Sequence, residues 1–245
     1  LLTGHGTFVD DITRPGMLHA CFVRSPFARA VINSIDTSAA LALPGVHAVF
    51  TAADLNPDVR EAWHAVTGKD SPDTPRPPLA EGTVKFVGDP VALVVAENRY
   101  IAEDAIELVD VDYDPLPAIA DFTRAVGADV VIHDDYPDNV AGGLAGAPPD
   151  KEVFASAAYV VEERVYQQAY VPVPIETRGL VVEWLASAGE LTMWASTQTP
   201  HELRAFAARL LGIAAQRVRV IMRDTGGGFG QKVVPMREDM CIMLA

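Results

Sequence analysis

The sequence predicts an α+β fold divided into two domains, and three observations support this prediction. Short β-branched strand patterns and helical patterns are mixed along the 245 residues. A stretch rich in glycine, proline and small residues, Asn139 to Pro149, separates the two halves. Towards the end of the chain, a strand pattern leads through a loop with four glycines, residues 226–230, into a helical pattern. Two domains of ordinary size also fit this length.

We expect the first domain to span residues 1–122. Its strand patterns lie at 17–24, 30–35, 46–50, 91–96 and 109–113. The run 91–96 is continuously apolar, which is typical of a strand that is covered on both faces. Short helices are expected at 38–43 and 52–55, and a longer one after Asn98, a favoured N-cap residue. Four prolines at 71–78 predict an irregular loop.

We expect residues 123–150 to form a linker and residues 151–245 to belong to the second domain. A short helix is predicted at 151–158, and strands at 159–166, 180–185, 191–195 and 217–222. Thr199 and Glu202 predict a capping box at the start of a helix, with Pro200 at its first position. Gly212 is expected to end this helix. A last helix is expected after Pro235, with Met236, Met240 and Leu244 left uncovered.

Composition excludes several classes of function. A net charge of −14 without a basic patch speaks against nucleic acid and anionic membranes as partners. No apolar run approaches the roughly 18 residues that span a bilayer. The six histidines show no metal-ligand spacing and no C-x-x-C motif exists, so we expect no metal held by protein ligands. Cys21 and Cys241 are expected to be buried free thiols.

The glycine loop has two interpretations. Glycine tolerates positive φ and lets a ligand approach the backbone, and successive amide groups can bind an anion. The alternative is a tight turn between a strand and a helix. Neither common phosphate loop fits, because Gly226, Gly228 and Gly230 give G-x-G-x-G and Gln231 separates Gly230 from Lys232. We expect the ring of Phe229 to be buried and to anchor the loop.

Two further polar stretches are candidates. Ser196 to Pro200 follows a strand and precedes a helix, a place where polar side chains tend to face a cleft. There the neutral amide of Gln198 can donate a hydrogen bond to an oxo group. The alternative is a polar turn that only starts the helix. Glu176 and Arg178 are expected to form an ion pair at the start of a strand.

Motifs along nearly the whole chain then match one family in their order. They are Gly6–Asp11, Gly16–Ala20, Val23–Pro26, Leu43–Val46, Phe86–Ala92, Ala102–Ala105, Asp112–Pro117, Glu176–Gly179, Ser196–Gln198 and Gly226–Gly230. Each motif alone is weak, but their order and number are specific. The chain resembles the molybdenum-binding large subunit of the xanthine oxidase family, particularly the carbon monoxide dehydrogenase and aldehyde oxidase-like large chains.

The resemblance implies an α/β-hammerhead domain followed by the beginning of a molybdopterin-binding domain. It implies that Gln198 hydrogen-bonds an oxo ligand of molybdenum. It also implies that Gly227, Gly228, Phe229 and Gly230 contact the pterin cofactor, expected in its cytosine dinucleotide form. The metal is then held by the dithiolene of the cofactor and by no protein ligand. The family's catalytic glutamate is expected downstream of Ala245, so no catalytic residue is expected within the chain.

The implied function is that of a molybdenum hydroxylase that oxidises an aldehyde, carbon monoxide or a related small carbon substrate with water as oxygen source. Partner iron–sulfur (2Fe-2S) and flavin (FAD) subunits, a homodimer of heterotrimers and a cytoplasmic location are implied as well. Val233 stands where purine-oxidising members carry a glutamate, which makes xanthine doubtful. The chain is expected to be a fragment that is inactive alone. The alternative is a cofactor-free relative that acts as a binding or assembly module.

Overall fold

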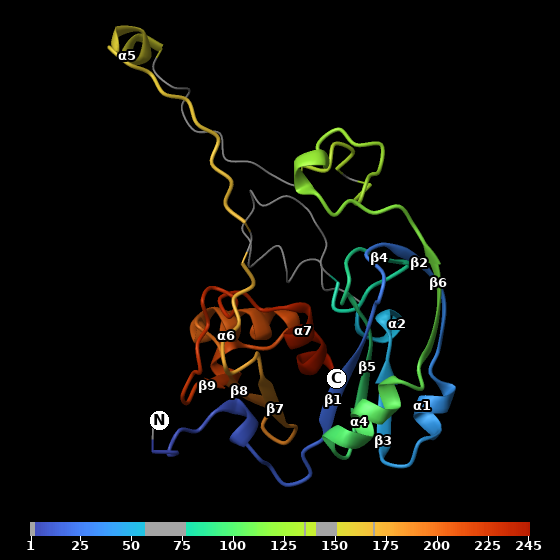
Figure 1. The fold of residues 1–245 in the computed structure, drawn as a ribbon. Coiled ribbons are helices and arrows are strands. Elements are labelled where there is room, and N and C mark those ends of the chain that lie inside the picture. Colours follow the sequence, from blue (N-terminus) through green and yellow to red (C-terminus); the bar gives the residue numbers. More distant parts are fainter. Residues whose placement is uncertain (1–2, 57–76, 135, 141–150, 169) are drawn as a thin grey trace.

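The computed structural model describes residues 3–56, 77–134, 136–140, 151–168 and 170–245. Within these ranges the strands form three sheets of three strands each (Figure 1). Two sheets belong to the first half of the chain and one to the second half. Most of the predicted loop at 71–78 lies outside the described residues.

The first sheet is built around β5 (Pro90–Ala96), which pairs antiparallel with β1 (His19–Arg24) and β3 (Val46–Phe50). Val94 packs in a cluster with Ala40 of α1 (Ser38–Ala42) and Ala105 of α4 (Arg99–Ile106). The preceding residue, Leu93, points to the opposite face and packs against Cys241. Both faces of β5 are therefore covered, as its continuous apolar run predicts.

The second sheet has the order β4 (Thr83–Val84), β2 (Ala30–Asp36) and β6 (Asp110–Pro115). Its core includes Ala30, Val84 and Val91. Short helices η1 (Val9–Asp11), α2 (Ala52–Leu55) and η2 (Phe122–Arg124) complete this half. The predicted cap of α4 is confirmed, because the Asn98 side chain accepts a hydrogen bond from the Ile101 amide at 3.0 Å.

The third sheet belongs to the second half of the chain. Strand β8 (Glu190–Ala195) lies between antiparallel β7 (Leu180–Leu185) and parallel β9 (Val218–Ile221). The crossover from β8 to β9 contains α6 (Pro200–Leu210) and η3 (Ala215–Arg217), and α6 buries Leu203 and Phe206. Gly212 ends α6 at φ +64°, and the Ile213 amide donates to Ala208 O at 2.9 Å, which forms a Schellman motif.

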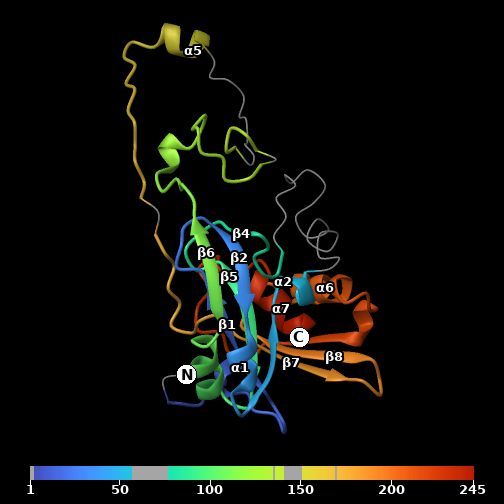
Figure 2. The same ribbon diagram turned by 90° about the vertical axis from the view of Figure 1, so that its right-hand side faces the viewer.

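Helix α7 (Arg237–Leu244) joins the two halves, and Figure 2 shows it between β7 and the strands of the first domain. Met240 and Met243 pack in the core of the third sheet, whereas Cys241 packs against Leu93. Arg237 forms a salt bridge with the buried Asp89. Both cysteines are free as predicted, although Cys21 is only partly buried. Burial, together with the charge of Glu238, raises the pKa of the Cys241 thiol to about 12.

Three predictions about the second half are wrong, two of them in part. Residues 159–166 form an exposed arm without strand pairing to the described residues, next to the small helix α5 (Lys151–Ser156) (Figure 1). Thr199 and Pro200 occupy the N-cap and first positions of α6 as predicted, but the capping box is absent, because the Thr199 hydroxyl donates to the carbonyl of Val233 instead. Met236 is exposed as predicted, whereas Met240 is fully buried and Leu244 packs against two core clusters, so most of the apolar face of α7 is covered.

The predicted domain limits and the linker at 123–150 stay a prediction, since residues 141–150 lie outside the described part of the chain. Within 123–140, the Asn139 amide group donates to Ala125 O at 2.9 Å and to Val130 O at 2.8 Å. Its side-chain oxygen accepts from the Ile132 amide at 3.0 Å. Asn139 thus holds this short segment together.

Replacing Arg237 with methionine is expected to loosen the contact between the two halves. The side chain of Asp89 is 3 % exposed, so it would keep a buried charge without its partner. Removing one member of such a pair typically costs about 3–5 kcal/mol in the free energy of unfolding. Urea denaturation measures this loss. The matched control is Arg99→Met, which removes an exposed pair with Glu103 and should have far less effect. Equal losses in both variants would contradict the role of Arg237.

Candidate functional site

The glycine loop, residues 226–230, follows β9, and its glycines are required by close approaches. A Cβ atom at Gly226 would lie 2.5 Å from Cβ of Glu176. One at Gly228 would lie 2.5 Å from Oε1 of Gln198. Gly227 adopts φ +99° and Gly230 φ +88°, backbone conformations that residues other than glycine rarely adopt. The loop is therefore fitted against Glu176 and Gln198.

The side chain of Glu176 binds several segments of the chain. Its Oε2 accepts hydrogen bonds from Ser196 Oγ at 2.6 Å and from the Gly226 amide at 2.8 Å. Its Oε1 accepts from the Val9 amide at 3.3 Å, which brings in the N-terminal segment. Burial raises the pKa of Glu176, but the bonds from Ser196, Gly226, Val9 and Lys232 outweigh it and hold this pKa below its usual range.

Lys232 is fully buried, and its ammonium completes this cluster. Nζ donates to Ser196 Oγ at 2.6 Å, to Glu176 O at 2.8 Å and to Glu176 Oε2 at 3.2 Å. Sequence reasoning assigned no role to Lys232, and its partners lie 36 and 56 residues away. No spacing rule in a single sequence links positions so far apart.

The expected ion pair between Glu176 and Arg178 is wrong. Arg178 instead binds Asp239 at 2.6 Å and Val234 O at 2.9 Å, and it also donates to the carbonyl of Gln231. Glu176 lies in a bend of the chain, and the side chains of Glu176 and Arg178 bind separate partners. Glu176 holds the start of the glycine loop, and Arg178 holds the segment between the loop and α7.

Gln198 has a defined amide orientation. Its Oε1 accepts from the Gly230 amide at 3.1 Å and from the Lys232 amide at 3.2 Å. Because two N–H donors can only meet an oxygen, the orientation of the side-chain amide follows from these contacts. The remaining NH2 group has no acceptor in the described part of the chain, and the side chain is exposed. Gln198 thus offers a hydrogen-bond donor next to the glycine loop.

Phe229 does not anchor the loop, contrary to the expectation. It is 72 % exposed and adopts φ +50°, with its ring near Gly227. Backbone hydrogen bonds hold the loop instead, among them Gln231 N to Gly228 O at 2.9 Å. The amides of Gly227, Gly228 and Phe229 donate to no acceptor within the described residues. The hydroxyl of Thr225, at the start of the loop, is buried and lacks a partner there as well.

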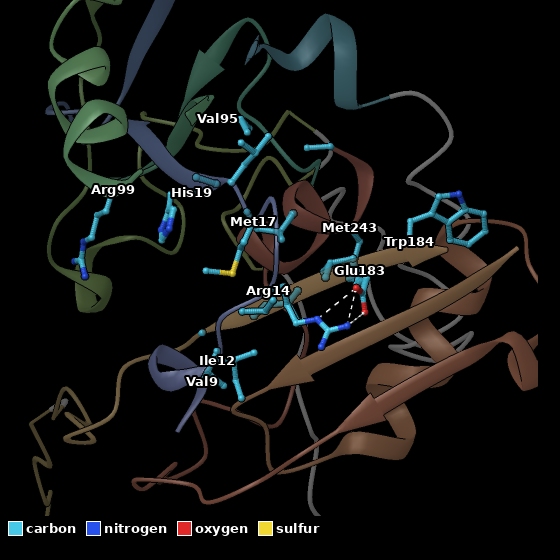
Figure 3. A pocket seen from close by; sticks show the side chains of 18 of the residues that line it. Val9, Ile12, Arg14, Met17, His19, Val95, Arg99, Glu183, Trp184 and Met243 are labelled. Carbon is cyan, nitrogen blue, oxygen red and sulfur yellow. Dashed lines mark hydrogen bonds and ion pairs between the residues drawn. The ribbon is translucent and has the colours of Figure 1, made fainter. Parts of the chain in front are cut away.

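A cavity of about 1090 Å³ lies between the two halves of the chain (Figure 3). Residues from the N-terminal segment, β1 and β7 line it together with Glu176, and Arg14 pairs with Glu183 within it at 2.9 Å. Gln198 and the glycine loop are not among its lining residues. We locate the candidate site at Gln198 and the loop, because their N–H donors lack acceptors among the described residues. The described residues contain no cluster of side chains able to hold a metal ion and no helix that could cross a membrane.

Two family models match the chain. Residues 3–117 match the family described as "Aldehyde oxidase and xanthine dehydrogenase, a/b hammerhead domain". Residues 132–245 match "Molybdopterin cofactor-binding domain", which contains Gln198 and the glycine loop. The fold and these two matches define a chain with an α/β-hammerhead domain followed by a molybdopterin cofactor-binding domain. The predicted fold class is confirmed.

Similar proteins specify the family. The nicotine 6-hydroxylase large subunit of Paenarthrobacter nicotinovorans is 40 % identical over the whole chain, which covers 30 % of that subunit. The carbon monoxide dehydrogenase large chain of Hydrogenophaga pseudoflava is 38 % identical, with 32 % of it covered. The structure of quinoline 2-oxidoreductase from Pseudomonas putida 86 superimposes with a TM-score of 0.84 at 35 % identity, over 98 % of this chain and 31 % of that one. The chain belongs to the xanthine oxidase family and spans about 30 % of the length of these relatives.

The Glu176 cluster predicts a pH dependence of stability. Because the folded state lowers the pKa of Glu176 below its ordinary 4.5, the carboxylate stabilises the fold above that pH. This contribution is lost as the pH falls through the lower, folded-state value. We expect the free energy of unfolding of the wild type to fall more steeply below pH 4.5 than that of Glu176→Gln. The exposed Glu162→Gln is the control, and parallel curves for wild type and Glu176→Gln would contradict the prediction.

Proposed function

We propose that the chain is part of the catalytic, molybdenum-cofactor-binding subunit of a hydroxylase. Its substrate would be an aldehyde, carbon monoxide or a related small carbon compound, with water as the source of oxygen. One observation carries the proposal. The oxygen of the Gln198 amide is bound by Gly230 and Lys232, and neither its NH2 group nor the amides of the neighbouring loop residues 227–229 have an acceptor among the described residues.

The chemistry of these donors fits a molybdopterin cofactor. Such a cofactor carries phosphate and other polar acceptors, and the amides of Gly227, Gly228 and Phe229 are donors of the required kind. The NH2 group of Gln198 adds a neutral donor that keeps its protons during the reaction. When bound, the cofactor supplies the redox metal at which the carbon substrate gives up two electrons. The residues of this chain orient it and exchange no electrons themselves.

The names of similar proteins support the presence of partner subunits. One is a large subunit, and another is subunit gamma of the 6-hydroxypseudooxynicotine dehydrogenase complex. We therefore propose partner subunits that carry 2Fe-2S and FAD. The family resemblance is the basis for three further proposals: a dimer of heterotrimers, a cytosine dinucleotide form of the cofactor and a cytoplasmic location. Val233 in place of a glutamate speaks against purines. Relatives named for nicotine and quinoline add N-heterocycles to the candidate substrates.

Replacing Gln198 with alanine in the complete enzyme is expected to lower turnover while molybdenum content stays intact. A hydrogen bond to a charged group is typically worth about 1.5–3 kcal/mol. This corresponds to a loss of roughly tenfold or more in kcat. The control is Gln216→Ala, which removes an exposed glutamine far from the loop. Steady-state rates with aldehydes, carbon monoxide and N-heterocycles provide the measurement. Equal rates for wild type and Gln198→Ala would remove Gln198 from the site.

A further inference from the structure

We propose that Lys232 is a positioning residue whose buried ammonium fixes the amide orientation of Gln198, an inference that rests on the proposed function. Lys232 lies next to the loop but presents no atom of its side chain to solvent. It therefore does not contact a ligand at the surface. Its contribution passes through the backbone that holds Gln198.

The ammonium group of Lys232 makes three contacts, one for each of its N–H donors. Its three contacts are Ser196 Oγ at 2.6 Å, Glu176 O at 2.8 Å and Glu176 Oε2 at 3.2 Å. A lysine ammonium has three N–H donors, so none is left over. Ser196 follows the end of β8 and Glu176 precedes β7, and these two segments lie at the same end of the third sheet. The side chain of Lys232 thus ties its own backbone to these two segments.

The backbone of Lys232 in turn holds Gln198 at both ends. The carbonyl of Lys232 accepts hydrogen bonds from the backbone N–H of Gln198 at 2.8 Å and from Thr197 Oγ1 at 3.1 Å. Its N–H donates to Oε1 of Gln198 at 3.2 Å. Without the ammonium, the backbone of Lys232 would lose its ties to Ser196 and Glu176, and its N–H would hold Oε1 less firmly, which leaves the bond from Gly230 as the main restraint. The side-chain amide would then be free to rotate and present its oxygen, an acceptor, where the site requires a donor.

The free-energy cost of burying the ion pair between Lys232 and Glu176 supports a role of Lys232 in positioning Gln198. Replacing a buried ion pair with apolar groups is often neutral or stabilising, because desolvation offsets the attraction between the charges. Glu176 and Lys232 also neutralise each other, so together they present no net charge to a ligand. What an apolar substitute cannot reproduce is the set of directed hydrogen bonds from Nζ.

A double-mutant cycle in the complete, cofactor-loaded enzyme tests the proposal. The variants are Lys232→Met, Gln198→Ala and the two combined, with rates divided by molybdenum content. If Lys232 acts through Gln198, Lys232→Met lowers kcat by up to about tenfold with little change in KM. The combined variant is then no slower than Gln198→Ala alone. The exposed Lys151→Met is the matched control. Losses that multiply in the combined variant, or an unchanged kcat in Lys232→Met, would overturn the proposal.

A second measurement needs no turnover and separates this inference from the proposed function. Hydrogen exchange should accelerate at the amides of Gly230 and Lys232 in Lys232→Met, while the amides of β7 keep their wild-type rates. Ser196→Ala removes one of the acceptors of the ammonium and gives a milder form of the same change if Lys232→Met does not fold. If Gln198→Ala leaves kcat unchanged, the proposed function fails. The exchange rates still test whether Lys232 positions Gln198. Wild-type protection at Gly230 and Lys232 in both variants would overturn it.

Discussion

The buried contact between Lys232 and Glu176 is the interaction on which the arrangement of the site depends. Through Glu176 it reaches the N-terminal segment at Val9 and the first glycine of the loop, Gly226. Through Ser196 it reaches the end of β8. Four segments that are distant in sequence are thereby fixed around the point where Gln198 meets the loop. The candidate site is thus built on the ordered ends of strands, and the exposed Phe229 adds little to its rigidity.

Helix α7 gives this arrangement a second support. Its residues pack on one side into the core of the third sheet and on the other side against β5 of the hammerhead domain. Arg178 connects α7 to the segment after the loop through Asp239, and Arg237 connects it to Asp89. The same short helix therefore joins the two halves of the chain and holds the far end of the loop. The position of the loop and the contact between the domains therefore both depend on α7.

Local patterns in the sequence predicted much of this fold, and contacts between distant residues account for the rest. The apolar run of β5 and the Gly212 stop of α6 are local signals, and both are confirmed. Alternation at 159–166 indicates an extended chain but does not tell whether a neighbouring strand exists to pair with it. Local patterns singled out Gln198 and the loop as candidates, and the family resemblance assigned their roles towards a cofactor. The partners of Glu176 and Lys232 were missed because their positions depend on the completed fold.

We infer that Gln198 and the glycine loop, held by Lys232 and Glu176, face a molybdenum cofactor. A high-resolution structure of the complete enzyme with its cofactor is the decisive measurement. We expect the NH2 group of Gln198 to face the cofactor while its oxygen remains bound to the amides of Gly230 and Lys232. We also expect cofactor contacts along residues 227–230. A cofactor bound elsewhere, or a Gln198 amide turned with its oxygen towards the cofactor, would refute this arrangement.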